Sequence, residues 1–293
     1  MESVNLIGPM LVMLAVGGIL LVADAFGRRW LDGWQRRWPA LLALLGPVGA
    51  TSWTTAHALA GTHGEAFAGS FVLDELAIFF ALLIAAAVGG VILASAEALA
   101  GHRRQAEYYA LLLASGAGLT VLAGGQDLIA LLVALELTSL SQFVLVAFLK
   151  DERGTEAGIK YVVIGAISAA VVLYGMALLF GATGTTSLAG IREALPGALE
   201  RLRPMVVMAA VLLGAGLGFK MAVVPFQMWV PDVYQGAPTP VTAYLSVASK
   251  AGGFAVALRL FGVGLGVDPL AQEWSTLFAV LSALSMTLGN VMA

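Results

Sequence analysis

The feature that most constrains the fold of this chain is a series of long apolar stretches, each followed by a polar or breaker-rich connection. A helix that crosses the hydrocarbon core of a bilayer needs about 20 mostly apolar residues. Nine stretches meet this requirement, so the sequence predicts an all-α, polytopic transmembrane helical bundle of about nine spans. The predicted spans cover residues 5–26, 40–60, 72–95, 107–124, 128–149, 159–181, 205–224, 240–263 and 274–293.

The composition agrees with a membrane protein and excludes several kinds of site. Of the 293 residues, 60% are hydrophobic and 11% are charged, whereas a soluble domain carries about 25% charged residues. The chain has no cysteine, which excludes disulfides and iron–sulfur ligation, and its three histidines form no cluster with metal-ligand spacing. The net charge of -3 does not indicate nucleic-acid binding. No cleavable signal peptide is expected, because Glu2 stands where a basic segment would precede the first apolar run.

The basic residues are divided unevenly between the two sides of the predicted bundle. With the connections numbered in order, the odd ones hold nine Lys and Arg residues and the even ones hold three. Because basic connections tend to stay in the cytoplasm, the segments around Arg36, Arg103 and Arg153 are predicted to be cytoplasmic. The N-terminus is then outside, in a multi-pass protein of the cell inner (plasma) membrane. The long even-side connection 182–204 is expected to contain a short helix of its own.

The seventh predicted span is expected to be discontinuous. Pro225 has no N–H group, and its ring crowds the carbonyl of Met221 four residues earlier. The helix should therefore break or kink just after Lys220. Broken helices at membrane depth survive only where protein or a water-filled cavity satisfies the freed backbone groups, and in transporters they often mark the ion site.

Three charged side chains, Glu136, Lys220 and Lys250, are predicted to lie inside the membrane. Each such charge costs about 2.5–3.5 kcal/mol on insertion scales, so each needs a partner or a hydrated cavity. They form either a structural ion pair or a proton relay. A relay suits lysine, which can lose its charge when buried, whereas arginine effectively cannot.

Polar residues at the ends of the predicted spans are given simpler interpretations. Asp127 is expected to cap the fifth span. Asp74 and Glu75 are expected to lie in an outer interfacial turn. Lys160, at the edge of the sixth span, is either a cytoplasmic anchor or a residue that takes up protons.

Three stretches carry a resemblance to a known family. FKMAVVPFQMWVPDVYQGAPTPVTAYLSVASKAG (219–252) resembles the most diagnostic segment of the N subunit of respiratory complex I, NADH-quinone oxidoreductase. ALELTSLSQFVLVAF (134–148) and EAGIKYVVIGAISAAVVLYGMALLFGATGT (156–185) resemble the fifth and sixth helices of that subunit. The likeness runs from about residue 107 to the end of the chain. The amino-acid sequence of the first stretch is more similar to the N subunit than to its L and M relatives.

The resemblance implies a division of the chain into three parts. Residues 1–106 correspond to three leading helices, 107–263 to a complete five-helix antiporter-like repeat, and 264–293 to the start of a second, incomplete repeat. Family members have about fourteen helices, so the chain is interpreted as truncated, either naturally or as a fragment.

The resemblance also implies roles for four residues. Glu136 would regulate Lys220 on the broken seventh helix, Lys250 would be the connecting lysine of the eighth helix, and Lys160 becomes a functional candidate at the start of the sixth. The implied function is proton translocation, as a membrane subunit of the translocase NADH-quinone oxidoreductase. The chain itself would hold no redox centre; NADH, quinone, FMN and iron–sulfur clusters are expected on partner subunits, among them other membrane subunits of complex I.

Two other functions stay open from the sequence. The first is a cation/proton antiporter subunit without redox coupling. The second is a membrane scaffold that keeps the buried charges only as an ion pair.

Overall fold

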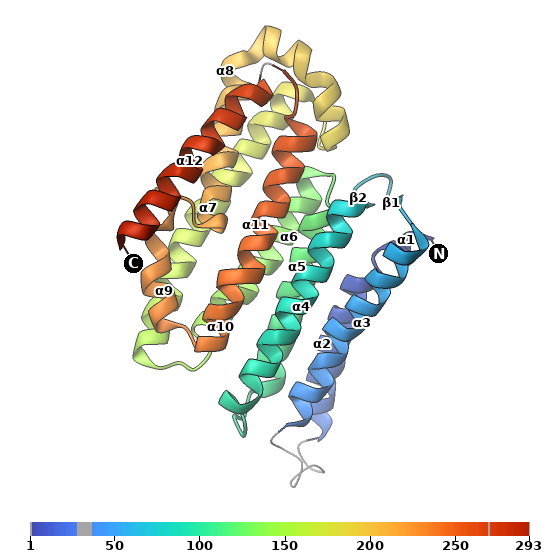
Figure 1. Cartoon of the computed structure of the whole chain (residues 1–293), viewed down its shortest axis with the longest axis vertical. Helices are drawn as coiled ribbons and strands as arrows, with labels where there is room; N and C mark the ends of the chain where they lie inside the picture. The colour runs from blue at the N-terminus through green and yellow to red at the C-terminus, as the bar shows by residue number, and fades with distance from the viewer. Residues whose placement is uncertain (1, 28–36, 269, 293) are drawn as a thin grey trace.

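The computed structural model describes residues 2–27, 37–268 and 270–292. Long helices run side by side along one axis and form an all-α bundle (Figure 1). The helices of the first half of the chain are α1 (Glu2–Leu6), α2 (Gly8–Gly27), α3 (Trp38–Ala60), α4 (Glu75–Ala98), α5 (Gln105–Gly124) and α6 (Leu128–Val146). Those of the second half are α7 (Glu152–Thr183), α8 (Leu188–Met221), η1 (Phe226–Trp229), α9 (Val230–Gly236), α10 (Thr239–Tyr244), η2 (Leu245–Ser249), α11 (Lys250–Ala257), η3 (Leu258–Gly264) and α12 (Leu270–Met292).

The expected all-α polytopic fold is confirmed. Eight helices in the described part of the chain are long and apolar enough to cross a membrane. The expectation was about nine, and the difference is α3. This helix forms over 23 residues, but its second half carries the polar run TSWTTAH (51–57), which lowers its hydropathy below that of the other spans.

A short antiparallel hairpin, which the sequence did not predict, precedes α4. Its strands are β1 (Gly64–Ala66) and β2 (Phe71–Leu73), with Glu65 opposite Val72. The third predicted span therefore begins at Glu75 rather than at residue 72.

Carboxylate caps determine where several helices begin. Asp127 accepts hydrogen bonds from the N–H groups of Ile129 and Ala130 at 2.8 and 3.3 Å, so it caps α6 as predicted. Asp151 accepts from the N–H of Gly154 at 3.2 Å and starts α7 seven residues before the predicted sixth span. A cap of this kind satisfies N–H groups that have no partner within the helix, and it is independent of hydropathy.

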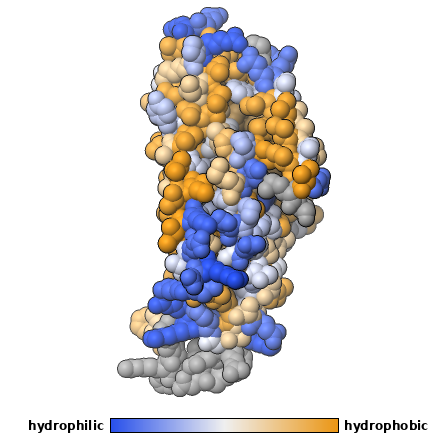
Figure 2. All heavy atoms as spheres, turned by 90° about the vertical axis from the view of Figure 1, so that its left-hand side faces the viewer, coloured by the Kyte–Doolittle hydropathy of each residue, from blue (hydrophilic) through white to orange (hydrophobic). Residues whose placement is uncertain are grey.

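The interior and the periphery of the bundle differ sharply. On α5, the side chains of Tyr108, Tyr109, Leu112, Leu113 and Leu119 are fully buried. The outward faces of the other helices expose many large apolar side chains, and α12 is almost entirely exposed. Figure 2 shows apolar side chains over much of one face, with hydrophilic side chains at the top and over the lower third. Exposed apolar faces of this kind form a surface for lipid or for neighbouring membrane proteins.

The seventh predicted span is discontinuous, as expected. Helix α8 ends at Met221, Ala222 adopts a left-handed conformation with φ of 58°, and η1 and α9 follow as separate short helices. Before its membrane part, α8 bends at Leu202, whose φ of -133° is not helical. The segment before this bend is the short helix expected within 182–204, and it lies across the upper end of the bundle (Figure 1).

Candidate functional site

The backbone groups freed at the break of the seventh span have partners in the protein. The N–H of Val223 donates to the carbonyl of Gly218 at 2.9 Å, and that of Val224 donates to the Ser285 hydroxyl of α12 at 3.1 Å. The indole N–H of Trp229 donates to the Phe219 carbonyl at 3.1 Å. Pro225 lies in this non-helical segment and has no backbone N–H group that would need an acceptor. The break is therefore compatible with a membrane interior, where each unsatisfied group would cost several kcal/mol.

Lys220 lies one residue before the end of α8, and only 5% of it is exposed. Its Nζ donates to Gln142 Oε1 at 2.9 Å and to Ser139 Oγ at 3.3 Å, both on α6. Glu136, partly buried on the same helix, acts on Lys220 electrostatically. No ion pair joins the two in the described part of the chain. In this conformation the immediate partners of Lys220 are neutral.

Gln142 is the centre of a buried hydrogen-bond network, here called the Gln142 network. Its amide oxygen accepts from Lys220 at 2.9 Å, Ser249 at 3.0 Å and Tyr161 at 3.1 Å. Its amide nitrogen donates to Ser115 Oγ at 3.3 Å, which also accepts from Tyr244 OH at 2.8 Å. One uncharged side chain thus connects helices α5, α7, α8 and η2 to α6. Hydroxyl groups both donate and accept, so most members of this network can pass on a proton.

Lys250 follows Ser249 of the Gln142 network directly in the sequence. Its Nζ donates to the hydroxyl of Tyr234 on α9 and lies 4.8 Å from the centre of the Tyr234 ring. The preceding segment, η2, is a π-helical stretch. Such stretches are rare within α-helices and occur frequently at functional sites. The structure therefore brings Lys250 to the edge of the network that binds Lys220.

Aromatic rings close the site on the side of α7. Tyr161 is stacked on Trp229 with centroids 4.7 Å apart, and the Phe143 ring meets Tyr161 edge-on at 4.9 Å. Phe219 contacts Trp229 at 5.1 Å. These ring contacts hold Tyr161 in the position from which its hydroxyl donates to Gln142.

Lys160 lies in a separate polar cluster at the end of the bundle that carries the α6–α7 connection. Its Nζ is 2.8 Å from Glu156 and 2.9 Å from Asp232, and its side chain is 43% exposed. A polar cavity of about 610 Å³ opens beside these groups and is also lined by Arg153 and Gln235. Because Asp232 lies on α9, this short helix contacts both Lys160, through Asp232, and Lys250, through Tyr234.

A fourth buried charge, Arg259, was missed in the sequence, where only three charges were placed inside the membrane. It lies within the predicted eighth span and is 2% exposed, so counting charges in that span would have found it. Its guanidinium binds both carboxylate oxygens of Asp74 at 2.5 and 2.7 Å, and its Nε donates to the Ala123 carbonyl at 2.7 Å.

Asp74 is therefore more than part of an interfacial turn. It caps α4 by accepting from the Ala77 N–H at 2.9 Å while it pairs with Arg259. Burial raises the pKa of Asp74, but the hydrogen bonds and charge of Arg259 and the Ala77 N–H outweigh this effect and hold the pKa below its ordinary value. This pair ties the start of α4 to the end of the eighth span.

The sequence also missed the two carboxylates that pair with Lys160, Glu156 and Asp232, and two uncharged polar residues of the site. Gln142 and Tyr234 were not singled out, because neither carries a charge that would mark it within an apolar span. In the described residues, no group of three or more His, Cys, Asp or Glu side chains is placed to hold a metal ion.

Known proteins resemble the chain over nearly its whole length. NADH-quinone oxidoreductase subunit N of Dehalococcoides mccartyi is 40% identical over 296 residues, which cover 99% of this chain and 60% of that protein. A chain in the structure of respiratory complex I from Thermus thermophilus with bound aureothin matches with a TM-score of 0.74 and 32% identity, covering 96% of this chain and 58% of the other. The predicted resemblance to the N subunit is thus confirmed.

A more distant structure shares the fold. A chain of the membrane-bound sulfane sulfur reductase, an archaeal respiratory membrane complex, matches with a TM-score of 0.76 and 26% identity, over 92% of this chain and 56% of the other. The chain spans about half of the length of the curated relatives that it matches. Residues 125–293 match the family profile described as "NADH:quinone oxidoreductase/Mrp antiporter, TM". The chain belongs to this family of NADH:quinone oxidoreductase and Mrp antiporter transmembrane proteins.

Proposed function

We propose that this chain translocates protons as a membrane subunit of the N type in an NADH-quinone oxidoreductase. The observation that carries the proposal is Lys220: a buried lysine at a helix break, bound to Gln142, which also accepts from Ser249, the residue directly before Lys250. The names of the curated relatives support the type of subunit.

The proposed proton path passes three lysine residues. Protons are taken up at Lys160, which lies beside a polar cavity with Glu156 and Asp232. Lys220 is the central carrier, and Glu136 modulates its charge from a distance. Lys250 receives the proton next, on the far side of the Gln142 network.

The surroundings of the subunit follow from the same proposal. NADH, FMN, iron–sulfur clusters and the quinone site belong to partner subunits, and other membrane subunits of complex I flank this chain. The three predicted parts, 1–106, 107–263 and 264–293, correspond to the leading helices, the first antiporter-like repeat and the start of the second.

The proposed location is the plasma membrane, with the N-terminus outside. Its support is that six basic residues of the described chain gather at the end of the bundle that lies lower in Figure 1, against three at the other end. Those at the lower end are Arg37, Arg103, Arg104, Lys150, Arg153 and Lys160; those at the upper end are Arg192, Arg201 and Arg203. The first group would face the cytoplasm.

The main alternative is a cation/proton antiporter subunit without redox coupling, because the family includes Mrp antiporters. The energy source distinguishes the two functions, because an antiporter exchanges a cation for protons without NADH. A scaffold that retains its charges only as an ion pair is less compatible with Lys220, whose immediate partners are an amide and a hydroxyl.

The test uses the complete subunit within its membrane complex, in closed vesicles. Lys220→Ala should abolish most NADH-driven proton uptake while the complex still assembles. Arg192→Ala, on an exposed part of α8, is the matched control and should pump normally. Normal pumping by an assembled Lys220→Ala complex would reject the proposal. Cation-driven proton exchange in the absence of NADH would favour the antiporter instead.

A further inference from the structure

A groove opens on the surface formed by α5, α6 and α7, on the other side of the Phe143 ring from Tyr161 of the Gln142 network. Its volume is about 960 Å³, near the upper end of the range of ordinary small-molecule pockets, about 300–1,000 Å³. Most of its wall is apolar. Val144, Ile159, Val162 and Val163 expose between 42% and 61% of their surfaces. The groove therefore presents a long apolar face toward the surroundings of the bundle.

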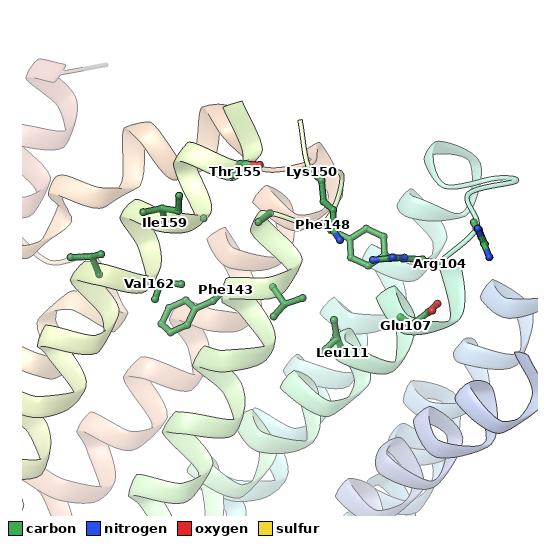
Figure 3. A pocket seen from close by; sticks show the side chains of 14 residues that line it. Arg104, Glu107, Leu111, Phe143, Phe148, Lys150, Thr155, Ile159 and Val162 are labelled. Carbon is green, nitrogen blue, oxygen red and sulfur yellow. The ribbon is translucent and has the colours of Figure 1, made fainter. Parts of the chain in front are cut away.

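One end of the groove is basic. Arg103 and Arg104, from the turn before α5, and Lys150, from the turn after α6, line it together with Glu107. Figure 3 shows Arg104 and Lys150 extending toward each other at the ring of Phe148. Three cations face one carboxylate, so this end carries a surplus of positive charge. Since both turns connect spanning helices at the same end of the bundle, the cations stand at the level of a membrane surface.

Lys150 adopts a left-handed backbone conformation, with φ of 56°. A residue with a Cβ atom is uncommon in this region, where glycine fits without strain. The position therefore carries a long cationic side chain although the backbone would favour glycine.

We propose that this groove binds one anionic phospholipid, with its phosphate between Arg104 and Lys150 and an acyl chain along the wall of α6 and α7. The arrangement matches the two halves of such a lipid, which are a charged headgroup at the membrane surface and a hydrocarbon chain below it. Basic pockets between transmembrane helices on the cytoplasmic side are suited to anionic headgroups. The surplus positive charge favours a headgroup with net negative charge over a zwitterionic one.

A transmembrane helix from another subunit is the competing occupant. It would have to cover Arg103, Arg104 and Lys150, and burying these cations requires carboxylates at matching positions on the incoming helix. The phosphate of a phospholipid lies at the level of these cations, and the rest of its headgroup stays in water. The charge and the apolar wall together therefore favour the lipid.

The test uses the chain purified from its native membranes with its associated subunits. It is placed in nanodiscs that contain photoreactive phosphatidylglycerol or photoreactive phosphatidylcholine with the same acyl chains. Crosslinked peptides are mapped by mass spectrometry. Phosphatidylglycerol should label peptides of the groove in α6 and α7, and phosphatidylcholine should label them weakly.

The charge requirement is tested with Arg104→Gln/Lys150→Gln. Each cation near an anionic lipid is worth roughly a fivefold change in binding, so the double variant should lose groove labelling by about 25-fold. Arg192→Gln/Arg201→Gln removes two exposed cations at the other end of the bundle and should label as the unchanged protein does. Ile159→Trp, which fills the apolar wall and leaves the charges intact, should also reduce labelling.

Three results would overturn the proposal. One is equal labelling of the groove by the two lipids. Another is full phosphatidylglycerol labelling in the Arg104→Gln/Lys150→Gln variant. The third is that a photoreactive amino acid at position 159 captures a polypeptide in the native membrane, because the groove would then be a protein interface.

Discussion

Replacing Gln142 by glutamate tests whether Lys220 has to release its proton. The substitution keeps the length and shape of the side chain and puts a carboxylate where the amide oxygen now accepts from Lys220 at 2.9 Å. At an effective dielectric constant of about 20, two unit charges at this separation attract by roughly 6 kcal/mol before desolvation. If desolvation of the new carboxylate cancels half of this, about 3 kcal/mol remains to hold the proton on Lys220.

A barrier higher by about 3 kcal/mol slows proton release by roughly a hundredfold. The Gln142→Glu complex should therefore oxidise NADH with little or no proton translocation, or turn over slowly where the two processes are tightly coupled. The assay is quinone-dependent proton uptake in vesicles, measured together with NADH oxidation and assembly. Gln272→Glu makes the same chemical change at an exposed position of α12 and should leave pumping unchanged.

The two roles of Lys220 give opposite results for Gln142→Glu. If Lys220 served only as a structural cation, a tighter partner would leave pumping intact and would stabilise the complex. A normal ratio of protons to NADH in an assembled Gln142→Glu complex would therefore refute the idea of Lys220 as a proton carrier.

Four further predictions concern the buried charges and the topology. Asp74→Asn leaves the buried Arg259 without its anion and should destabilise the chain by about 3–5 kcal/mol in detergent unfolding, whereas Arg259→Met should cost less because Asp74 is 38% exposed and can be hydrated. Because the folded pKa of Asp74 is below its ordinary value, this stabilisation is present above that value, about 4, and should disappear in unfolding measurements as the pH falls below it. Glu136→Gln and Lys220→Ala should each impair proton uptake in assembled complexes, and the double variant should be less impaired than the sum of the two; strictly additive effects would show that the residues act independently. A cysteine at Arg103 should react with an impermeant thiol reagent from the cytoplasmic side, and labelling from outside alone would reverse the topology.

The helices of the bundle could be predicted from the sequence because hydropathy is a local property. The less apolar α3 and the hairpin before α4 show the limit of this signal. Segment ends were less accurate, since Asp74 and Asp151 set the starts of α4 and α7 through individual hydrogen bonds. The break of the seventh span was anticipated from Pro225, and the helix ends at Met221, directly after Lys220 as predicted.

The contacts of the site could not be predicted in the same way. Glu136, Lys220 and Lys250 stand out because a charge is costly in an apolar segment. Gln142 does not, and its bond to Ser249 joins residues 107 positions apart in the chain. Which neutral side chain meets Lys220 depends on how α6, α8 and η2 pack, and no periodicity within one helix encodes that packing.

The break in the seventh span explains how the separate lysine sites are connected. A continuous helix would carry the residues after Met221 onward along one axis, but the non-helical segment at Pro225 lets α9 form as an independent short helix. On α9, Asp232 binds Lys160 and Tyr234, two residues later, binds Lys250. Because α9 spans only seven residues, these two contacts lie close together on one short helix. The same break leaves Lys220 at the last turn of α8, beside the Gln142 network. The discontinuity therefore places the exposed cluster of Lys160, the buried Lys220 and the half-buried Lys250 around one short segment.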